Sequence, residues 1–325
     1  MASTVDSKSE LNRLLHETFT SPVRKGYITV QGFCLPERYQ KFAQAIEDFE
    51  VKDDDVWVCS FPKTGTTWTQ EMIWCIANNA DFEKAKVPLN IRFPFLEFSA
   101  LFDFAAVPAH PEMKNDLTIT DSVTYTKNQT SPRFIKTHLP FRLLPRQIRT
   151  GEKKPKIIYV CRNPKDTCIS YYYHCKLVED YRGDFNTFCR LFLGDTLGYT
   201  PYWDNLVEFW HKRNEPNILF LKYEDMKADL SAVIKKSAAF LNKSVSDDQM
   251  KLLLDHLSFA SMKANPAVNY EHVVENIKKR REVVGNDKFI RSGKVGQWKE
   301  EMPENIIQQF DKMTKEKLSV HNLFF

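Results

Sequence analysis

The chain has 325 residues, 42% hydrophobic and 27% charged, a composition typical of a globular protein with one large α/β domain or two smaller ones. Its formal net charge of +4 is too small to require a polyanion, so nucleic acid is not an expected partner. No apolar run approaches the roughly 18 residues of a membrane span, so no membrane partner is expected either.

The cysteines and the N-terminal segment indicate a reducing compartment. Seven cysteines form an odd set without a C-x-x-C pair, and several lie in apolar surroundings typical of reduced core thiols. The start of the chain has neither the basic residues nor the apolar core of a signal peptide. We therefore expect a cytoplasmic protein, with a polar tail over residues 1–25 and one domain over residues 26–325.

Apolar runs that predict strands alternate along the chain with segments of helical periodicity. The predicted strands occupy residues 27–30, 56–61, 133–136, 157–161 and 218–221. The predicted helices occupy residues 35–49, a segment from residue 66 onward, residues 185–193 and residues 202–212, and helices dominate toward the C-terminus. This alternation predicts a single α/β domain with a central parallel sheet flanked by helices.

The turn after the 56–61 strand has the composition of an anion site. Pro62 and Gly65 end the strand, and a helix with apolar spacing opens near Thr66. A helix N-terminus presents unpaired N–H groups and the positive end of the helix dipole. Lys63 adds a charge, and threonines at 64, 66 and 67 add hydroxyl donors. We predict a phosphate or sulfate here; the alternative is a strand-to-helix turn that carries these residues without a ligand.

This loop differs from the nucleoside-triphosphate loop G-x-x-x-x-G-K-[ST]. Here Lys63 precedes the only glycine, Gly65, and the loop is shorter. A small-molecule kinase on a related scaffold is therefore an alternative that a magnesium requirement would favour. A protein that binds hydrophobic small molecules without turnover is a further alternative.

Polar side chains also follow two other predicted strands, at the sheet edge where open α/β sheets bind ligands. His138, next to Lys136, could take a proton from an incoming nucleophile, or it could be a hydrogen-bonded core histidine. Arg162 and Ser170 could clamp a second phosphate. Alternatively, Arg162 could pair with Asp166 and only fix the turn.

Four segments together resemble the motifs of the cytosolic sulfotransferases, in the family's order and at about its spacing. They are Pro62–Trp68, Lys136–Pro140, Arg162–Ser170 and Arg291–Trp298. The resemblance covers about residues 27–300 and implies a P-loop-like phosphosulfate-binding loop. It implies transfer of a sulfuryl group from 3′-phosphoadenosine 5′-phosphosulfate to a hydroxyl or amine of a small hydrophobic acceptor. The leaving product is 3′-phosphoadenosine 5′-phosphate.

The resemblance also implies roles for individual residues. The 5′-phosphosulfate would be held by Lys63, Thr64, Gly65, Thr66 and Thr67, and the 3′-phosphate by Arg162, Ser170, Arg291, Ser292 and Gly293. The adenine would lie between Trp68 and Phe259, with Tyr223 at its edge. The catalytic residues would be His138 as the general base, with Lys63, Lys136 and Ser170. An in-line displacement at sulfur needs positioning and cations, and no clustered His, Cys or Asp pattern indicates a metal.

An irregular aromatic segment over residues 91–110 is the expected acceptor pocket. Its phenylalanines at 95 and 98 resemble those that flank the acceptor in the family. Phe33, Tyr173 and Tyr270 are weaker candidates. A flat apolar slot suits phenols, catechols or hydrophobic alcohols, although such rings can also be plain core.

Two positions and one motif depart from the family pattern. Ser292 replaces a frequent lysine near the expected 3′-phosphate, and Leu257 replaces a frequent hydroxyl residue. A homodimer stays open, although the family's dimer motif keeps only Lys299 here. The sequence does not identify the acceptor, and a relative that acts through a sulfated allylic alcohol would be a net dehydratase.

Overall fold

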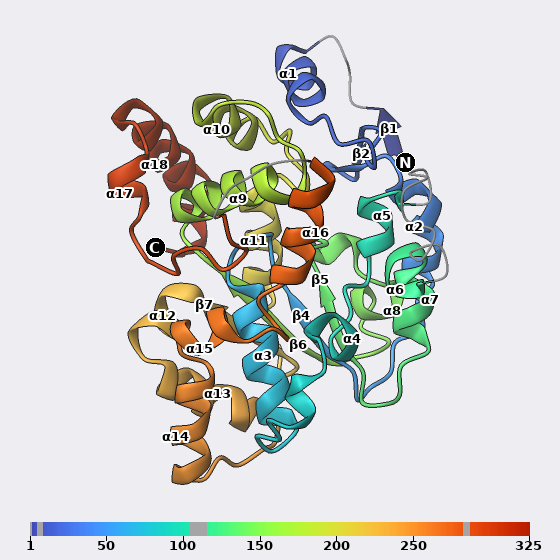
Figure 1. Cartoon of the computed structure of the whole chain (residues 1–325), viewed down its shortest axis with the longest axis vertical. Coiled ribbons are helices and arrows are strands. Elements are labelled where there is room, and N and C mark those ends of the chain that lie inside the picture. The colour runs from blue at the N-terminus through green and yellow to red at the C-terminus, as the bar shows by residue number, and fades with distance from the viewer. Residues whose placement is uncertain (1, 5–8, 105–115, 282–286) are drawn as a thin grey trace.

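The computed structural model describes residues 2–4, 9–104, 116–281 and 287–325. Residues 105–110 of the predicted acceptor segment therefore lie outside the described residues. The central sheet has four parallel strands in the order β5-β4-β6-β7 (Figure 1). These strands are β4 (Val56–Cys59), β5 (Phe134–Thr137), β6 (Lys156–Cys161) and β7 (Ile218–Lys222). They coincide with four of the five predicted strands, and the parallel α/β prediction is confirmed.

A second, antiparallel sheet contains the fifth predicted strand. It consists of β1 (Ala2–Thr4), β2 (Tyr27–Val30) and β3 (Phe33–Pro36). The helix predicted over residues 35–49 is wrong at its start, because α2 begins only at residue 39 (Tyr39–Glu47). Gln31 and Gly32 have φ values of 48° and 88°, which suit a two-residue hairpin turn and pair residues 33–36 with β2.

The N-terminal segment, expected as a polar tail, contains packed structure. Helix α1 (Glu10–Thr18) is capped by the Ser9 side chain, which accepts a hydrogen bond from the backbone N–H of Asn12. Leu15 on this helix is fully buried, and α1 packs against α10. This part of the segment therefore belongs to the folded body.

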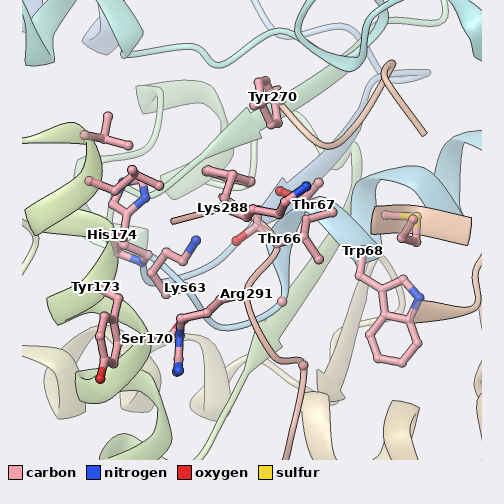
Figure 2. A pocket seen from close by; sticks show the side chains of 18 of the residues that line it. Lys63, Thr66, Thr67, Trp68, Ser170, Tyr173, His174, Tyr270, Lys288 and Arg291 are labelled. Carbon is pink, nitrogen blue, oxygen red and sulfur yellow. The ribbon is translucent and has the colours of Figure 1, made fainter. Parts of the chain in front are cut away.

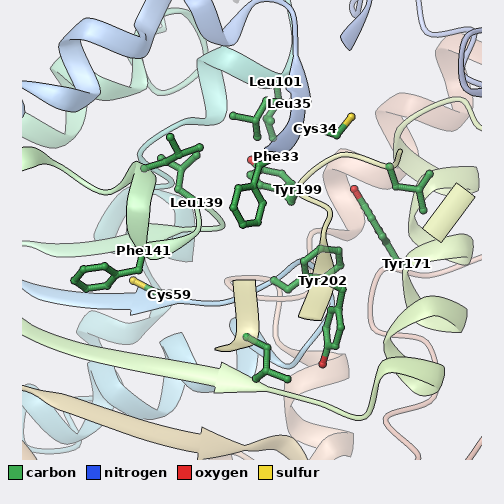
Figure 3. Packing of buried hydrophobic residues seen from close by; sticks show 14 of the residues in the cluster. Phe33, Cys34, Leu35, Cys59, Leu101, Leu139, Phe141, Tyr171, Tyr199 and Tyr202 are labelled. Atoms are coloured by element: carbon green, nitrogen blue, oxygen red, sulfur yellow. The ribbon is translucent and has the colours of Figure 1, made fainter. Parts of the chain in front are cut away.

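Helices cover both faces of the central sheet. They are needed on both sides because successive apolar side chains of β4 point to opposite faces. Val56 and Val58 pack into one buried cluster, and Trp57 and Cys59 pack into the other. Helices of the first cluster are α3 (Thr66–Ala77), α13 (Leu230–Phe240), α14 (Asp247–His256) and α15 (Phe259–Ala264). Helices of the second are α9 (Pro164–Val178), α10 (Phe185–Leu193), α11 (Tyr202–His211) and α18 (Glu304–Leu318). Figure 3 shows part of the second cluster.

Shorter elements connect these layers. The remaining α-helices are α4 (Leu89–Arg92), α5 (Phe98–Leu101), α6 (Leu117–Thr120), α7 (Ser122–Lys127), α8 (Arg146–Arg149), α12 (Tyr223–Ala228), α16 (Glu271–Arg281) and α17 (Trp298–Glu301). The 3₁₀ helices are η1 (Lys84–Lys86), η4 (Phe141–Leu143) and η5 (Ser319–His321). Within the described residues no helix combines the length and the apolar character needed to cross a bilayer. All seven cysteines are buried and free of disulfides.

Candidate active site

A cavity of about 340 Å³ opens at the C-terminal ends of the central strands, where the sequence predicted the ligand site. Figure 2 shows side chains of α9 and of the loop before α3 projecting into it. Of the predicted site residues, the cavity is lined by Lys63, Gly65, Thr66, Thr67, Trp68, Phe95, Phe98, Lys136, His138, Arg162, Ser170, Tyr173, Tyr223, Phe259, Tyr270, Arg291, Ser292 and Gly293.

The loop between β4 and α3 turns tightly enough to present a helix N-terminus to the cavity. Lys63 and Gly65 both have positive φ values, 69° and 103°. A Cβ on Gly65 would lie 2.6 Å from Cδ2 of Tyr223, so this position needs glycine for both reasons. The Thr64 hydroxyl does not face the cavity as predicted. It is buried, 2.8 Å from the Phe61 carbonyl oxygen and 2.9 Å from that of Val160, and it fastens the loop to the sheet.

Two half-buried lysines, Lys63 and Lys136, lie at this loop and at the end of the neighbouring strand. Burial, followed by the charges of Lys136 and Arg162, lowers the pKa of Lys63 to about 7. Burial lowers the pKa of Lys136 to about 8. Their ammonium groups lie over aromatic rings, with Lys63 Nζ 4.2 Å from the Phe289 centroid and Lys136 Nζ 4.0 Å from that of Phe95. An anion bound between the lysines would relieve both the burial and the mutual repulsion of these charges.

The hydrogen bonds of His138 define which ring nitrogen is available. Its Nδ1 lies 2.8 Å from the backbone carbonyl oxygen of Ser60, which can only accept a hydrogen bond. Nδ1 therefore carries the proton, and Nε2 keeps its lone pair. Burial, then the charge of Lys136, holds the pKa of His138 well below its usual value. The imidazole is neutral and able to accept a proton.

A buried carboxyl group fixes the backbone of the same histidine. Glu97 Oε1 accepts a hydrogen bond from the His138 backbone N–H at 2.7 Å. Leu96 N–H donates to the Lys136 carbonyl oxygen at 2.9 Å, and Lys136 N–H donates to that of Pro94 at 2.8 Å. Hydrogen bonds therefore tie the segment that carries the predicted acceptor residues directly to β5, the strand just before His138.

The Arg162 guanidinium points at the C-terminal loop rather than at Asp166. Its Nη2 donates to the Lys294 carbonyl oxygen at 2.7 Å, and its Nε is buried without a hydrogen-bond partner among the described residues. Asp166 instead accepts hydrogen bonds from the backbone N–H groups of Gly296 and Trp298, at 2.7 and 3.2 Å. Asp166 thus holds the loop, and the orphan N–H of Arg162 remains for a ligand.

Arg291 and Ser292 lie on that loop and share one partner. Arg291 Nη2 lies 2.9 Å from Gln297 Oε1, and Ser292 Oγ donates to the same oxygen at 2.6 Å. Gly293 has a φ of 61°, and a Cβ there would lie 2.6 Å from Cδ2 of Phe259. The loop therefore packs closely against the ring predicted to cover the adenine.

The other predicted adenine residues lie together. Trp68 Nε1 donates to the Leu257 carbonyl oxygen at 2.9 Å, and the Trp68 and Tyr223 rings are 5.6 Å apart. The Tyr223 hydroxyl donates to the Gly293 carbonyl oxygen at 3.0 Å. Phe259 is 37% exposed and lines the same cavity. These contacts leave an aromatic slot beside the cationic cluster.

The predicted acceptor residues lie in four different places. Phe95 and Phe98 lie at the aromatic wall, with ring centroids 6.1 Å apart. Tyr173 lies nearer the cations, because the Arg291 guanidinium is 4.2 Å from its ring. Tyr270 lines the cavity 4.9 Å from the Phe289 ring. Phe33 is the exception: it is 1% exposed in the core cluster and does not line the cavity (Figure 3). The hairpin turn at Gln31 directs this ring into the core.

The cavity also contains residues that the sequence reasoning missed. His174 and Glu179 on and after α9 line it, as do Tyr199, Lys288 and Phe289. His174 follows Ser170 by four residues, so helical spacing could have indicated that the two share a face. Nothing in the sequence pattern indicates the others.

One cluster outside the cavity has metal-ligating residue types. Ligand atoms of Glu71, Cys75 and His256 lie within 4.8 Å of one another. The sequence did not suggest it, because His256 comes from a distant helix. Glu71 already pairs with the Arg92 guanidinium, and its Oε1 lies 2.7 Å from Nε2 of His256. These hydrogen bonds join α3, α4 and α14.

Comparison with known proteins agrees with this geometry. Residues 53–321 match the model of the sulfotransferase domain. The chain is 40% identical over 317 residues to luciferin sulfotransferase of Photinus pyralis, covering 97% of this chain and 86% of that protein. It is 31% identical over 291 residues to mouse sulfotransferase 1E1, covering 89% and 91%. Retinol dehydratase, solved with retinol and 3′-phosphoadenosine 5′-phosphate, superposes with a TM-score of 0.88 at 28% identity, covering 100% of this chain and 98% of that one.

The chain therefore belongs to the sulfotransferase domain family. It is a sulfotransferase that uses 3′-phosphoadenosine 5′-phosphosulfate, and the predictions of its family, fold and enzyme class are confirmed.

Proposed function

We propose that this sulfotransferase transfers the sulfuryl group to the hydroxyl of a small hydrophobic acceptor, such as a phenol, catechol or alcohol, with His138 as general base. One observation carries the proposal. His138 donates Nδ1–H to the Ser60 carbonyl oxygen at 2.8 Å, which leaves the basic Nε2 for the cavity that Lys63 and Lys136 also line.

The donor would occupy the cationic side of the cavity and supply the sulfuryl group. Lys63 and the N–H groups at the start of α3 would hold the 5′-phosphosulfate. The buried, unpartnered Nε of Arg162 supports a second phosphate there, together with Ser170 and Arg291. The slot between Trp68, Phe259 and Tyr223 suits a flat base.

The chemistry then follows from the positions of the charges. Nε2 of His138 would accept the proton of the acceptor hydroxyl as its oxygen attacks the sulfur. Lys63 and Lys136 would stabilise the negative charge that develops on the transferred group and on the leaving phosphate. Lysines with lowered pKa values suit this role, because an arriving anion restores their charge. The proposal therefore needs no metal.

The aromatic wall supports the acceptor class. Phe95 and Phe98 line the side of the cavity next to His138, and the Phe95 ring is 5.0 Å from the His138 ring. An apolar slot beside the general base suits a flat acceptor whose hydroxyl points at the histidine. A relative named for luciferin and a structural neighbour solved with retinol support a small-molecule acceptor.

The likeness to retinol dehydratase supports a second candidate outcome. A sulfuryl ester of an allylic alcohol is a good leaving group, so the same site could complete a net loss of water. Product analysis with retinol distinguishes the two outcomes, because a sulfate ester and an alkene differ in mass.

The seven buried, unpaired cysteines support a cytoplasmic location.

The test combines donor binding with turnover. We expect calorimetry in EDTA to detect binding of 3′-phosphoadenosine 5′-phosphate but not of ATP. We expect His138→Ala to lower kcat for phenol sulfonation by about 10²- to 10⁴-fold while donor affinity stays within about threefold. His211→Ala, on the exposed end of α11, is the matched control and should behave as wild type. Retained turnover in His138→Ala would refute the general-base role.

A further inference from the structure

A single carboxylate faces the cavity among the described residues that line it. Glu179 shares this cavity with six cationic side chains. These are Lys63, Lys136, Arg162, Lys227, Lys288 and Arg291. A donor with several negative charges would be repelled by a carboxylate, so Glu179 is unsuited to donor binding. Its partner Arg24 lies beside Leu101 and Phe102 of the aromatic side, so the position of Glu179 needs a different explanation.

Only one oxygen of Glu179 has a strong partner. The side chain is 8% exposed, and its Oε2 pairs with Arg24 Nη1 at 2.5 Å. Arg24 is held in turn by the Tyr27 hydroxyl at 2.9 Å and the Leu101 carbonyl oxygen at 3.2 Å. The other oxygen, Oε1, lies 3.7 Å from Nε2 of His174, which is too far for a direct hydrogen bond. A carboxylate oxygen can accept two hydrogen bonds, so Oε1 retains capacity.

His174 lines the same cavity as this carboxylate and lies next to it. It follows Ser170 by one turn of α9, and burial, then the charge of Lys63, holds its pKa well below the usual value. The imidazole is therefore neutral and can either donate or accept at Nε2. Tyr199, another lining residue, has its ring 5.5 Å from the His138 ring.

Apolar side chains also face this part of the molecule. Leu101, Phe102 and Val178 line the same cavity. An acceptor that is apolar throughout would bury Oε1 without a hydrogen bond, which is costly for a carboxylate. A hydroxyl placed between Oε1 and His174 Nε2 could donate to the first and accept from the second, since each could lie about 2.8 Å away.

We propose that Glu179 and His174 bind a second hydroxyl of the acceptor, remote from the one that is sulfonated. This inference rests on the proposed function and narrows its acceptor class to molecules with two polar ends joined by an apolar body. Arg24 already neutralises the carboxylate, so a neutral hydroxyl fits better than an ammonium group.

The test compares matched acceptors. We would measure kcat/KM for 4-alkylphenols with chains of two to four carbons, each with a terminal hydrogen, hydroxyl or ammonium group. At the chain length that reaches Glu179, the wild type should prefer the hydroxyl compound over the plain one by at least about tenfold. Glu179→Gln and His174→Phe should each reduce this preference to within about threefold.

Controls separate binding from a merely structural role. Glu208→Gln removes another arginine-paired carboxylate, partnered by Arg142 outside the cavity, and should keep the wild-type preference. If Glu179 only anchors Arg24, Glu179→Gln would lower kcat/KM equally for both members of a pair, and the inference would be wrong. Urea unfolding checks that the variants are folded, and Arg24→Gln, which keeps the carboxylate, should retain a preference for a polar chain end.

Three further outcomes would overturn the inference. Turnover of both members without preference at every chain length would refute the second-hydroxyl site and leave the proposed function intact. A preference for the ammonium compound over the hydroxyl compound would also refute it. If the wild type sulfonates none of the phenols although it binds 3′-phosphoadenosine 5′-phosphate, the proposed acceptor class falls, and this inference falls with it.

Discussion

Replacing Lys63 by arginine tests whether donor binding restores the positive charge of this half-buried lysine. In the unliganded protein, burial and the neighbouring cations lower the pKa of Lys63 to about 7. A bound phosphosulfate needs the ammonium form. The pKa must therefore rise on binding, and the protein must take up a proton wherever free Lys63 is neutral. Arginine keeps the charge at every accessible pH and removes this uptake.

The size of the effect follows from that pKa. At pH 8, a group with a pKa of about 7 is neutral in about 90% of molecules, so binding should take up about 0.9 proton at Lys63. Between pH 7 and pH 8 the charged fraction falls from about one half to about one tenth, so affinity should weaken about fivefold from this residue. The ligand's phosphates, with second pKa values near 6, are already ionised at pH 8 and contribute little.

The assay is calorimetry of 3′-phosphoadenosine 5′-phosphate at pH 8 in buffers of different ionisation enthalpy, which counts protons directly. Lys136, with a pKa of about 8, can add up to about half a proton in both proteins. The difference between wild type and Lys63→Arg therefore isolates Lys63. Lys299→Arg on the exposed surface is the matched control. Equal uptake in wild type and Lys63→Arg, or none in wild type, would refute the reasoning.

Two other predictions concern the second phosphate and the base. Arg162→Ala should weaken binding of 3′-phosphoadenosine 5′-phosphate by about 10- to 100-fold, because a charge-assisted hydrogen bond is lost. Its kcat at saturating donor should stay within a few-fold of the wild-type value. Unchanged affinity in calorimetry would contradict the 3′-phosphate role. The pKa of His138 lies well below 6.5, and its neutral form is the active one. Activity should therefore persist below pH 6.5 and fall only as the imidazole protonates, and an acid limb of kcat/KM centred above 6.5 would count against this base.

Local patterns predicted the parts of the fold that depend on neighbouring residues. The apolar runs of β4 to β7 and the break at Pro62 and Gly65 are readable without tertiary contacts, because strand burial and turn chemistry act locally. Parallel strands end at one sheet edge, so residues after different strands could be grouped in advance. His138 and Arg162 were assigned to one site in this way, and both line one cavity.

The errors arose where packing across the chain decides the outcome. Phe33 looked like an acceptor residue, but the hairpin turn at Gln31 directs its ring into the core. Thr64 looked like an anion donor, but its hydroxyl is within hydrogen-bonding distance of the carbonyl oxygens of Phe61 and Val160. A local sequence pattern does not predict whether a side chain will point into the core or into the cavity when both sides offer it contacts.

The sequence by itself determined the class of this protein. It predicts an anion-transfer site on a parallel sheet from four strands, a loop with a lysine at a helix N-terminus, and a histidine just after the next strand. Only the tertiary structure decided the electrostatics. Burial and mutual repulsion, which depend on residues distant in the chain, set the charge states of Lys63 and His138. The same holds for Glu179, whose carboxylate has a role only because Arg24 and His174 fold against it.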